Sequence, residues 1–347
     1  MPKLSVLDLA IVGEGSSHAE ALASSVDLAR NVERLGYHRH WVAEHHNMPG
    51  IASSAPAVLA ATLAAETERI RVGSGGVMLP NHVPLVIAEQ FGMLEALHPG
   101  RIDLGIGRAP GTDGITAAAL RRSVEALSDE DFPRQLAELI GFFRGEFPQG
   151  HPYNHITAVP GVGDQPEIWL LGSSGYSAQL AGMLGMRFSF AHHFMPRNTD
   201  AALELYRSSF RPSEQLAEPY AMVAVAAICA SDDERARYLS GPARLSMARL
   251  RAGRPTRFPT PEEAAAHEFS PAEEQSISAL SGSAMIGGRE TVKEKLDAFA
   301  ERTQADELMI TTMVHDHADR VRSYELIAEL YDLAAPEVAA TATMEDR

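Results

Sequence analysis

The stretch Trp41-Val42-Ala43-Glu44-His45-His46 places a carboxylate and two adjacent histidines at the end of a short apolar run, directly before the turn-prone residues 47–50. A buried strand that ends in ionisable groups and then a loop is how a (β/α)8 barrel presents chemically active side chains at its C-terminal face. The other interpretation of this stretch is a solvated pair of histidines at the start of a helix. The rest of the chain favours the first.

The remaining sequence alternates apolar runs with amphipathic segments. Strands are expected over residues 4–12, 39–43, 71–78, 101–105, 167–171, 186–191, 220–229 and 307–314. Helices are expected over residues 18–35, 56–67, 85–97, 132–144, 174–184, 200–210, 291–303 and 317–333. Eight strands that are each followed by a helix predict a parallel sheet, and closure into a (β/α)8 TIM barrel is the natural solution at this number. A doubly wound open sheet is the structural alternative.

The chain of 347 residues is long for one compact domain, but α/β barrels reach this size as single units. We expect one domain over residues 1–335 and a flexible tail over 336–347. Two stretches interrupt the repeat, at 110–131 after the fourth strand and at 241–288 after the seventh. Long insertions at the catalytic face often act as lids, so 241–288 is either a lid or a peripheral decoration.

The overall charge excludes several classes of partner. The formal net charge is −16, from 30 basic and 46 acidic residues, which argues against nucleic acid and against an anionic membrane surface. The first apolar run is too short and too charged for a signal or transmembrane segment. Cys229 is the single cysteine, so an intrachain disulfide is excluded and a reducing, cytoplasmic location is expected.

Glycines crowd the ends of two predicted strands. Gly73-Ser74-Gly75-Gly76 lies inside the third strand, where glycine marks either the close approach of a ligand or tight packing between barrel layers. The segment 105–111 superficially matches a dinucleotide-binding fingerprint, but its spacing is wrong and Pro110 stands where the helix should begin. What remains is Arg108 at the end of a strand, which is suited to a phosphate or carboxylate, or else to a structural ion pair.

The segment Gly172-Ser173-Ser174-Gly175-Tyr176-Ser177 joins the fifth strand to its helix. Backbone N–H groups at a helix N-terminus, together with hydroxyl groups, form an anion site. An ordinary serine N-cap is the alternative, but the extra glycines and the third serine favour a phosphate.

Further histidines follow later strands, at His192-His193 and at His315-Asp316-His317. With His45-His46 they could form a metal cluster like that of the metal-dependent hydrolases. That class carries a His-x-His pair after its first strand, and the first strand here carries no histidine. No metal site is therefore expected.

Taken together, these residues resemble the bacterial luciferase-like monooxygenases, which are flavin-dependent (β/α)8 enzymes. The nearest likeness is to their uncharacterised single-chain branch rather than to the light-emitting heterodimers. The resemblance spans nearly the whole chain and is carried by residues 7–8, 14–17, 36–47, 73–82, 99–108 and 305–310.

The resemblance implies a role for each matching residue. His45 corresponds to the catalytic histidine, and Gly75-Gly76 corresponds to the small pair whose non-prolyl cis bond lies beneath the isoalloxazine ring. Arg108 corresponds to the arginine that grips the flavin phosphate. A second phosphate clamp is implied at Ser173, Ser174, Gly175 and Ser177, and we expect a substrate pocket lined by His46, His192 and His193. The chain departs from the light-emitting branch at Ser173, where that branch has an acid, and at Gly107, where it has cysteine, so long-chain aldehyde specificity is not implied.

The resemblance also implies a mechanism. Reduced FMN and O2 would form a flavin C4a-peroxide that oxygenates a small organic substrate, in a site that excludes water. His45 titrates near neutrality and would transfer the proton. Because no NAD(P)H-binding glycine motif is found, a separate reductase is expected to supply reduced FMN. The alternatives are an FMN- or deazaflavin-dependent dehydrogenase on the same fold, and a non-catalytic flavin-binding protein.

A homodimer is expected through the helices 56–67 and 85–97. The first carries alanines at helical spacing and almost no charge, and an uncharged outer face on a barrel helix needs covering. The second offers Ile87, Phe91, Leu94 and Leu97 alongside. The alternative is that both faces meet only the barrel sheet.

Overall fold

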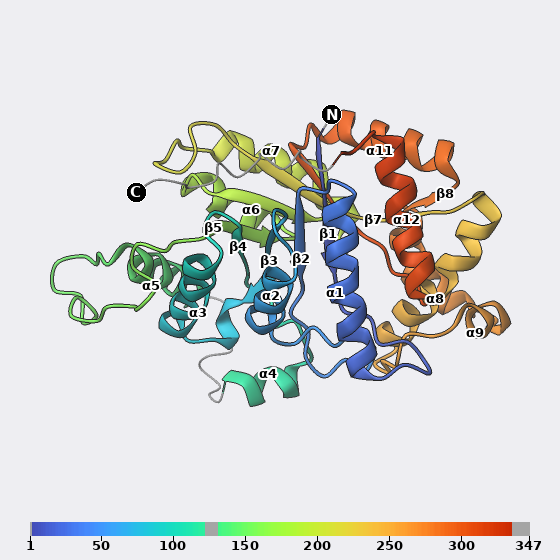
Figure 1. Cartoon of the computed structure of the whole chain (residues 1–347), viewed down its shortest axis with the longest axis horizontal. Coiled ribbons are helices and arrows are strands. Elements are labelled where there is room, and N and C mark those ends of the chain that lie inside the picture. Colours follow the sequence, from blue (N-terminus) through green and yellow to red (C-terminus); the bar gives the residue numbers. More distant parts are fainter. Residues whose placement is uncertain (1, 122–130, 335–347) are drawn as a thin grey trace, which may run out of the picture.

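The computed structural model describes residues 2–121 and 131–334, and eight parallel strands in it close into a barrel (Figure 1). The order around the barrel is β6-β5-β4-β3-β2-β1-β9-β7, and pairing of β6 with β7 closes the ring. The predicted (β/α)8 barrel is therefore confirmed. The barrel strands are β1 (Lys3–Asp8), β2 (Arg39–Val42), β3 (Arg71–Met78), β4 (Ile102–Gly107), β5 (Glu167–Gly172), β6 (Arg187–Ala191), β7 (Ala221–Cys229) and β9 (Glu307–Thr311).

Helices surround the barrel, as the alternating sequence pattern predicts. They are α1 (His18–Arg34), α2 (Pro56–Ala65), α3 (Pro84–Leu97), α5 (Phe132–Arg144), α6 (Gly175–Met183), α7 (Thr199–Ser209), α11 (Arg289–Thr303) and α12 (His317–Leu330). Within the described part of the chain, no helix combines the length and apolar character needed to span a membrane.

Both insertions contain secondary structure. The first carries α4 (Gly114–Arg121), and residues 122–130 lie outside the described residues, as does the predicted tail. The second carries α9 (Pro261–Ala266), α10 (Pro271–Ser281) and the short strand β8 (Met285–Gly287), which pairs with the end of β7 and was not predicted. The expected start of this insertion at residue 241 falls inside α8 (Asp233–Arg251), so the helix continues across that boundary.

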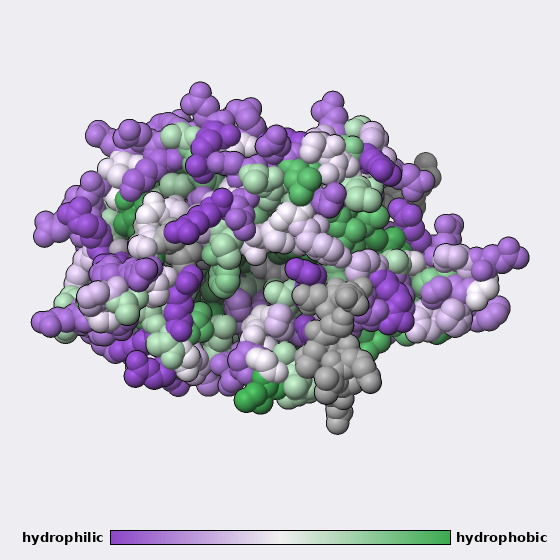
Figure 2. Space-filling model, turned by 180° about the vertical axis from the view of Figure 1, so that it is seen from behind, coloured by the Kyte–Doolittle hydropathy of each residue, from purple (hydrophilic) through white to green (hydrophobic). Residues whose placement is uncertain are grey.

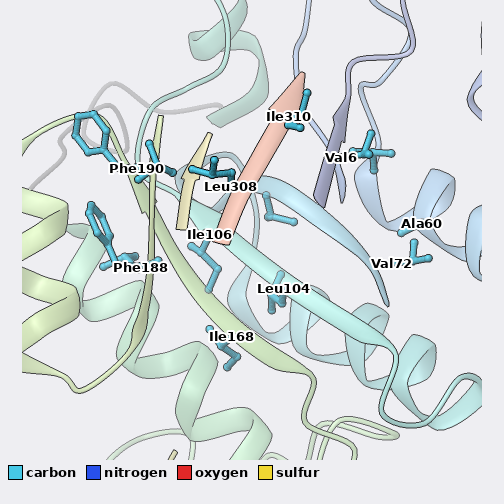
Figure 3. Close-up of a cluster of buried hydrophobic side chains, with 14 of the residues drawn as sticks. Val6, Ala60, Val72, Leu104, Ile106, Ile168, Phe188, Phe190, Leu308 and Ile310 are labelled. Atoms are coloured by element: carbon cyan, nitrogen blue, oxygen red, sulfur yellow. The ribbon is translucent and has the colours of Figure 1, made fainter. Parts of the chain in front are cut away.

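Alternate residues of each strand face the two sides of the barrel wall. One set packs against the helix layer and forms the main apolar core (Figure 3), including Val6, Leu104, Ile168, Phe188 and Ile310. The other set fills the barrel interior with Leu7, Trp41, Trp169, Met222 and Met309. Trp41 and Trp169 meet edge to face at 5.3 Å, so the middle of the barrel is closed by packed aromatic rings.

The barrel interior is charged at the end where the strands begin, which is opposite to the mouth. Arg39 contacts Asp103 at 2.9 Å, Glu167 at 2.8 Å and Glu307 at 2.9 Å. The Trp41 indole also donates to Asp103, at 2.8 Å. Because this network lies below the tryptophan layer, it is separated from the upper mouth of the barrel, where the C-terminal strand ends lie.

The second insertion is fastened to the loops at the barrel mouth. Phe258 is buried and forms a β-bridge with Gly13, with backbone bonds of 2.9 Å to Val12 and Glu14. Val12 in turn donates to the Gly50 carbonyl at 2.9 Å, so loops after β1 and β2 and the insertion form one wall. Viewed from behind, the molecule has a mostly hydrophilic rim and a hollow near the middle of the face (Figure 2).

Candidate functional site

His45 stands at the mouth because of the alternation along β2 and its extension. Trp41 and Ala43 belong to the interior cluster, so His45 continues the same side, while Glu44 faces away. The His45 ring is half-buried, and its Nδ1 lies 3.4 Å from the Gly111 carbonyl oxygen. Burial lowers the pKa of His45, so the ring is neutral at physiological pH and suited to accepting a proton.

Glu44 is a buried carboxylate that ties β2 to β3. It accepts hydrogen bonds from the Met78 amide at 2.9 Å, from His82 Nε2 at 2.9 Å and from His46 Nε2 at 3.0 Å. Burial alone would raise the pKa of Glu44, but these bonds outweigh it and lower the pKa. This role of Glu44 was not predicted, although Asn81-His82 stands just beyond β3 and supplies one of the partners.

His46 consequently lies outside the predicted substrate pocket. Its Nε2 is engaged by Glu44, on the side of the chain opposite to His45. The structure thus separates the two adjacent histidines into one that faces the mouth and one that supports the buried carboxylate.

Gly75 is partly exposed and Gly76 is buried, and both pack closely against neighbouring strands near the mouth. A Cβ atom on Gly75 would lie 2.9 Å from Leu7 and 3.0 Å from Trp41, and one on Gly76 would lie 2.7 Å from the Gly105 carbonyl oxygen. The peptide bond between them is cis, as the resemblance implies, and the register with β4 shifts at this point. Neither position has room for a side chain, and the partly exposed backbone of Gly75 is the part of this segment that a ligand in the mouth could approach closely.

Arg108 and the start of α6, the two parts of the expected phosphate site, lie together. The Arg108 guanidinium stacks over the Tyr176 ring at 4.6 Å, in the first turn of α6. Ser174 is the N-cap residue, yet its hydroxyl makes no capping bond, so the helix N-terminus keeps donors for an anion.

The other two members of the predicted clamp differ in exposure. Ser173 is half-buried, and its carbonyl accepts a bond of 3.4 Å from Asn198. Ser177 is buried close to Gly172, where a Cβ would lie 2.4 Å from the Ser177 Cβ. Ser177 therefore packs the turn from within, while Ser174 and Gly175 are the more accessible part of the clamp.

His192 and His193 diverge. The His192 ring packs against Phe299 of α11 at 4.5 Å and bonds Thr199 at 2.7 Å, and burial lowers its pKa to about 4. It lines a separate cavity of about 580 Å³ between α11 and the 3₁₀ turn η4 (Pro196–Asn198), rather than the mouth as predicted. His193 bonds the Ala224 carbonyl of β7, and burial is the main cause that lowers its pKa.

The later histidines are engaged elsewhere. His315 contacts the Glu14 carbonyl at 3.1 Å and His317 contacts Asp27 at 2.7 Å. Across residues 2–121 and 131–334, no group of three or more histidine, cysteine, aspartate or glutamate side chains is arranged to hold a metal ion.

The arrangement fits a flavin-type cofactor with a phosphate. The partly exposed backbone of Gly75 could lie against its ring, while Arg108 and the α6 N-terminus offer donors for its phosphate. A neutral imidazole stands in the same mouth, at His45.

Comparison with protein families and curated relatives agrees with this geometry. The family model described as luciferase-like monooxygenase matches residues 3–307. The chain is 53% identical over 328 residues to the uncharacterised protein YvbT of Bacillus subtilis, covering 94% of this chain and 96% of that protein. It is 47% identical over 326 residues to a luciferase-like monooxygenase of Escherichia coli, with the same coverage of both chains. An N-acetyl-S-alkylcysteine monooxygenase of Bacillus subtilis is 36% identical over 331 residues, covering 95% of this chain and 98% of that protein.

Solved structures share the fold. Apo-MsnO8 superposes with a TM-score of 0.86 at 37% identity, covering 96% of this chain and 99% of that one. The oxygenating constituent of 3,6-diketocamphane monooxygenase from Pseudomonas putida, solved with FMN, has a TM-score of 0.70 at 18% identity, covering 95% and 98%. An F420-dependent secondary alcohol dehydrogenase has the same score at 12% identity, with the same coverage.

Proposed function

Since this chain belongs to the luciferase-like monooxygenase family and is thus an oxidoreductase, we propose that it uses reduced FMN and O2 to oxygenate a small organic substrate. The proposal rests on three groups that lie at the same end of the barrel. The Gly75-Gly76 segment of β3, the cation of Arg108 at the α6 N-terminus and the neutral ring of His45 surround one barrel mouth. When bound, reduced FMN supplies the electrons that activate O2.

The residues of the chain have separate tasks in this proposal. Arg108 and the free N–H groups of α6 hold the phosphate, and Gly75-Gly76 support the ring. His45 accepts or returns one proton through Nε2. The wall formed by Phe258 and the loops after β1 and β2 limits the access of water.

A separate NAD(P)H-dependent flavin reductase is proposed as the source of reduced FMN, because the glycine segment 105–111 is not a dinucleotide motif. A cytoplasmic location, which the single buried thiol of Cys229 favours, would give access to such an enzyme.

The decisive test is O2 uptake by purified protein supplied with reduced FMN and a metabolite mixture that includes N-acetyl-S-alkylcysteines, because a relative is named for them. Incorporation of label from ¹⁸O2 into one metabolite is expected. Substrate oxidation with reduction of FMN or F420 and no O2 uptake would instead identify a dehydrogenase. Flavin binding with no substrate consumed would identify a binding protein.

Arg108→Ala should weaken FMN binding by about 10- to 150-fold, the equivalent of roughly 1.5–3 kcal/mol for a charge-assisted bond. Riboflavin, which lacks the phosphate, should bind both proteins equally well. Fluorescence titration of the two ligands measures this difference, and Arg30→Ala, which alters an exposed arginine of α1, is the control. An equal loss for both ligands would contradict the placement of the phosphate.

We further propose a homodimer through α2 and α3, although the structure changes which residues would form it. Ala60, Ile87, Phe91 and Leu94 are buried against the barrel, so they are unavailable for a partner. The outer face instead carries the exposed apolar side chains Val58, Val83, Val86, Met93 and Leu97. A patch of this kind on adjacent helices suits a twofold interface.

Val58→Glu combined with Leu97→Glu should give soluble monomer, because these side chains are 68% and 67% exposed and the barrel core is untouched. Light scattering at micromolar concentration measures the mass. Ile115→Glu on α4 is the matched control, since Ile115 is 86% exposed but lies outside this face. Wild-type protein that is already monomeric would contradict the proposal.

A further inference from the structure

His45 and His193 stand on opposite sides of the barrel mouth. His45 extends β2 and His193 extends β6. Going around the barrel in one direction, strands β3, β4 and β5 lie between β2 and β6. In the other direction, β1, β9 and β7 lie between them. The cofactor residues Gly75-Gly76, Arg108 and Ser174 belong to β3, β4 and the β5–α6 turn, so they occupy one half of the mouth. The other half, over β7, β9 and β1, lies between the two histidines.

Backbone carbonyls fix the tautomer of both rings. The Nδ1 of His193 lies 3.2 Å from the Ala224 carbonyl oxygen, and the Nδ1 of His45 lies 3.4 Å from that of Gly111. A carbonyl oxygen only accepts, so each Nδ1 carries the hydrogen and each Nε2 keeps its lone pair. The mouth therefore presents two hydrogen-bond acceptors.

The surroundings keep both rings uncharged. Burial lowers the pKa of His193 as it does that of His45. Among the described residues, the charges that act on His45 are those of Glu44 and His46, and the charge that acts on His193 is that of His45. Glu44 is already satisfied by bonds from the Met78 amide, His82 and His46, so it is not the orienting partner of His45.

We propose that His193 is a second catalytic base, which takes a proton from the substrate while His45 serves the flavin side. This rests on the proposed function. In the step, a substrate O–H or N–H bond breaks, its electron pair remains on oxygen or nitrogen, and a new N–H bond forms at Nε2 of His193. The substrate class is an uncharged molecule with an ionisable O–H or N–H group, such as a phenol or an enol, because the acceptor at Nε2 of His193 selects for a donor.

Resting protein provides a test that is independent of turnover. Nitrogen NMR shifts of labelled histidines should show hydrogen on Nδ1 of both His45 and His193. Phenol should perturb the Nε2 signal of His193, whereas anisole, which lacks only the O–H donor, should not. Hydrogen on Nε2 of His193, or equal responses to phenol and anisole, would overturn the assignment even if oxygenation is demonstrated.

Two variants separate catalysis from structure. His193→Asn keeps an N–H donor for Ala224 but removes the basic nitrogen, and we expect turnover to fall by about 100-fold or more, with FMN binding retained. His193→Gln places an amide at the Nε2 position and should be equally impaired. The logarithm of kcat/KM should fall with a slope of two below the histidine pKa values in wild type and a slope of one in His193→Asn. Wild-type activity in His193→Asn, or a slope of one in the wild type, would overturn the proposal.

Discussion

Replacing Arg39 by alanine should lower the free energy of unfolding by about 3–5 kcal/mol, the range for removing one partner of a buried ion pair. The Arg39 side chain is 3% exposed and faces Asp103 and Glu307, both fully buried, together with the partly exposed Glu167. Without the guanidinium, Asp103 would keep Arg71 and Glu167 would keep Arg187, but the buried Glu307 would retain only the hydroxyl groups of Ser5 and Tyr220. Urea denaturation at neutral pH measures the loss.

The size of this effect should depend on pH. Burial opposes ionisation of Glu167, but Arg39, Arg187 and Arg71 together outweigh it and lower the pKa of Glu167 to about 2. The stabilisation from Glu167 is therefore fully present above the pKa of the unfolded chain, near 4.5, and is lost as the pH falls towards 2. The difference between wild type and Arg39→Ala should shrink over the same interval.

Arg30→Ala provides the control for Arg39. Arg30 is an exposed residue whose pairing with Glu66 lies at the surface, so its loss should cost less than about 1 kcal/mol. An equal fall in the free energy of unfolding in both variants would show that the buried network of Arg39 stabilises the protein no more than a surface ion pair does.

His45→Ala should retain FMN binding but lose turnover by about 100-fold or more, the effect of removing a general acid or base. The ring is not needed for the Gly75-Gly76 segment or for the phosphate donors, because these belong to β3, β4 and α6. Turnover with excess reduced FMN, together with the dissociation constant of FMN, distinguishes the two effects.

His46→Ala is the matched variant for His45. His46 bonds Glu44 on the other side of the chain, so its loss should reduce turnover less, through looser positioning of β2 and β3. Full activity in both variants would remove the catalytic assignment of His45.

Regular periodicity predicted the barrel, whereas local backbone geometry set the ends of its strands. The first strand was expected over residues 4–12 but ends at Asp8, because Ala10 adopts a φ of 51° and its amide bonds the Asp8 side chain. That conformation is rare for alanine, so propensity gives no warning of it. Likewise, β8 spans only residues 285–287, too few to show a period of two.

The sequence predicted that some residues of the candidate site would lie close together, and the structure places these residues side by side. Gly75-Gly76 and Arg108 were expected at a cofactor site, and they lie at adjacent strand ends at the mouth. The histidine pairs were predicted less well, because neighbouring residues beyond a strand point to opposite sides. This alternation separates His46 from His45, and His192 from His193.

Ring closure joins the two ends of the described chain. β1 pairs with β2 on one edge and with β9 on the other. The second edge of β1, at Lys3–Val6, can form its hydrogen bonds only when Glu307–Ile310 is present. During synthesis, one edge of β1 and one edge of β7 therefore stay unpaired until β9 has been made, because β9 pairs with both. Fragments that end before β9 should accordingly aggregate, because both edges remain exposed. The intact chain should become resistant to aggregation only when the barrel closes.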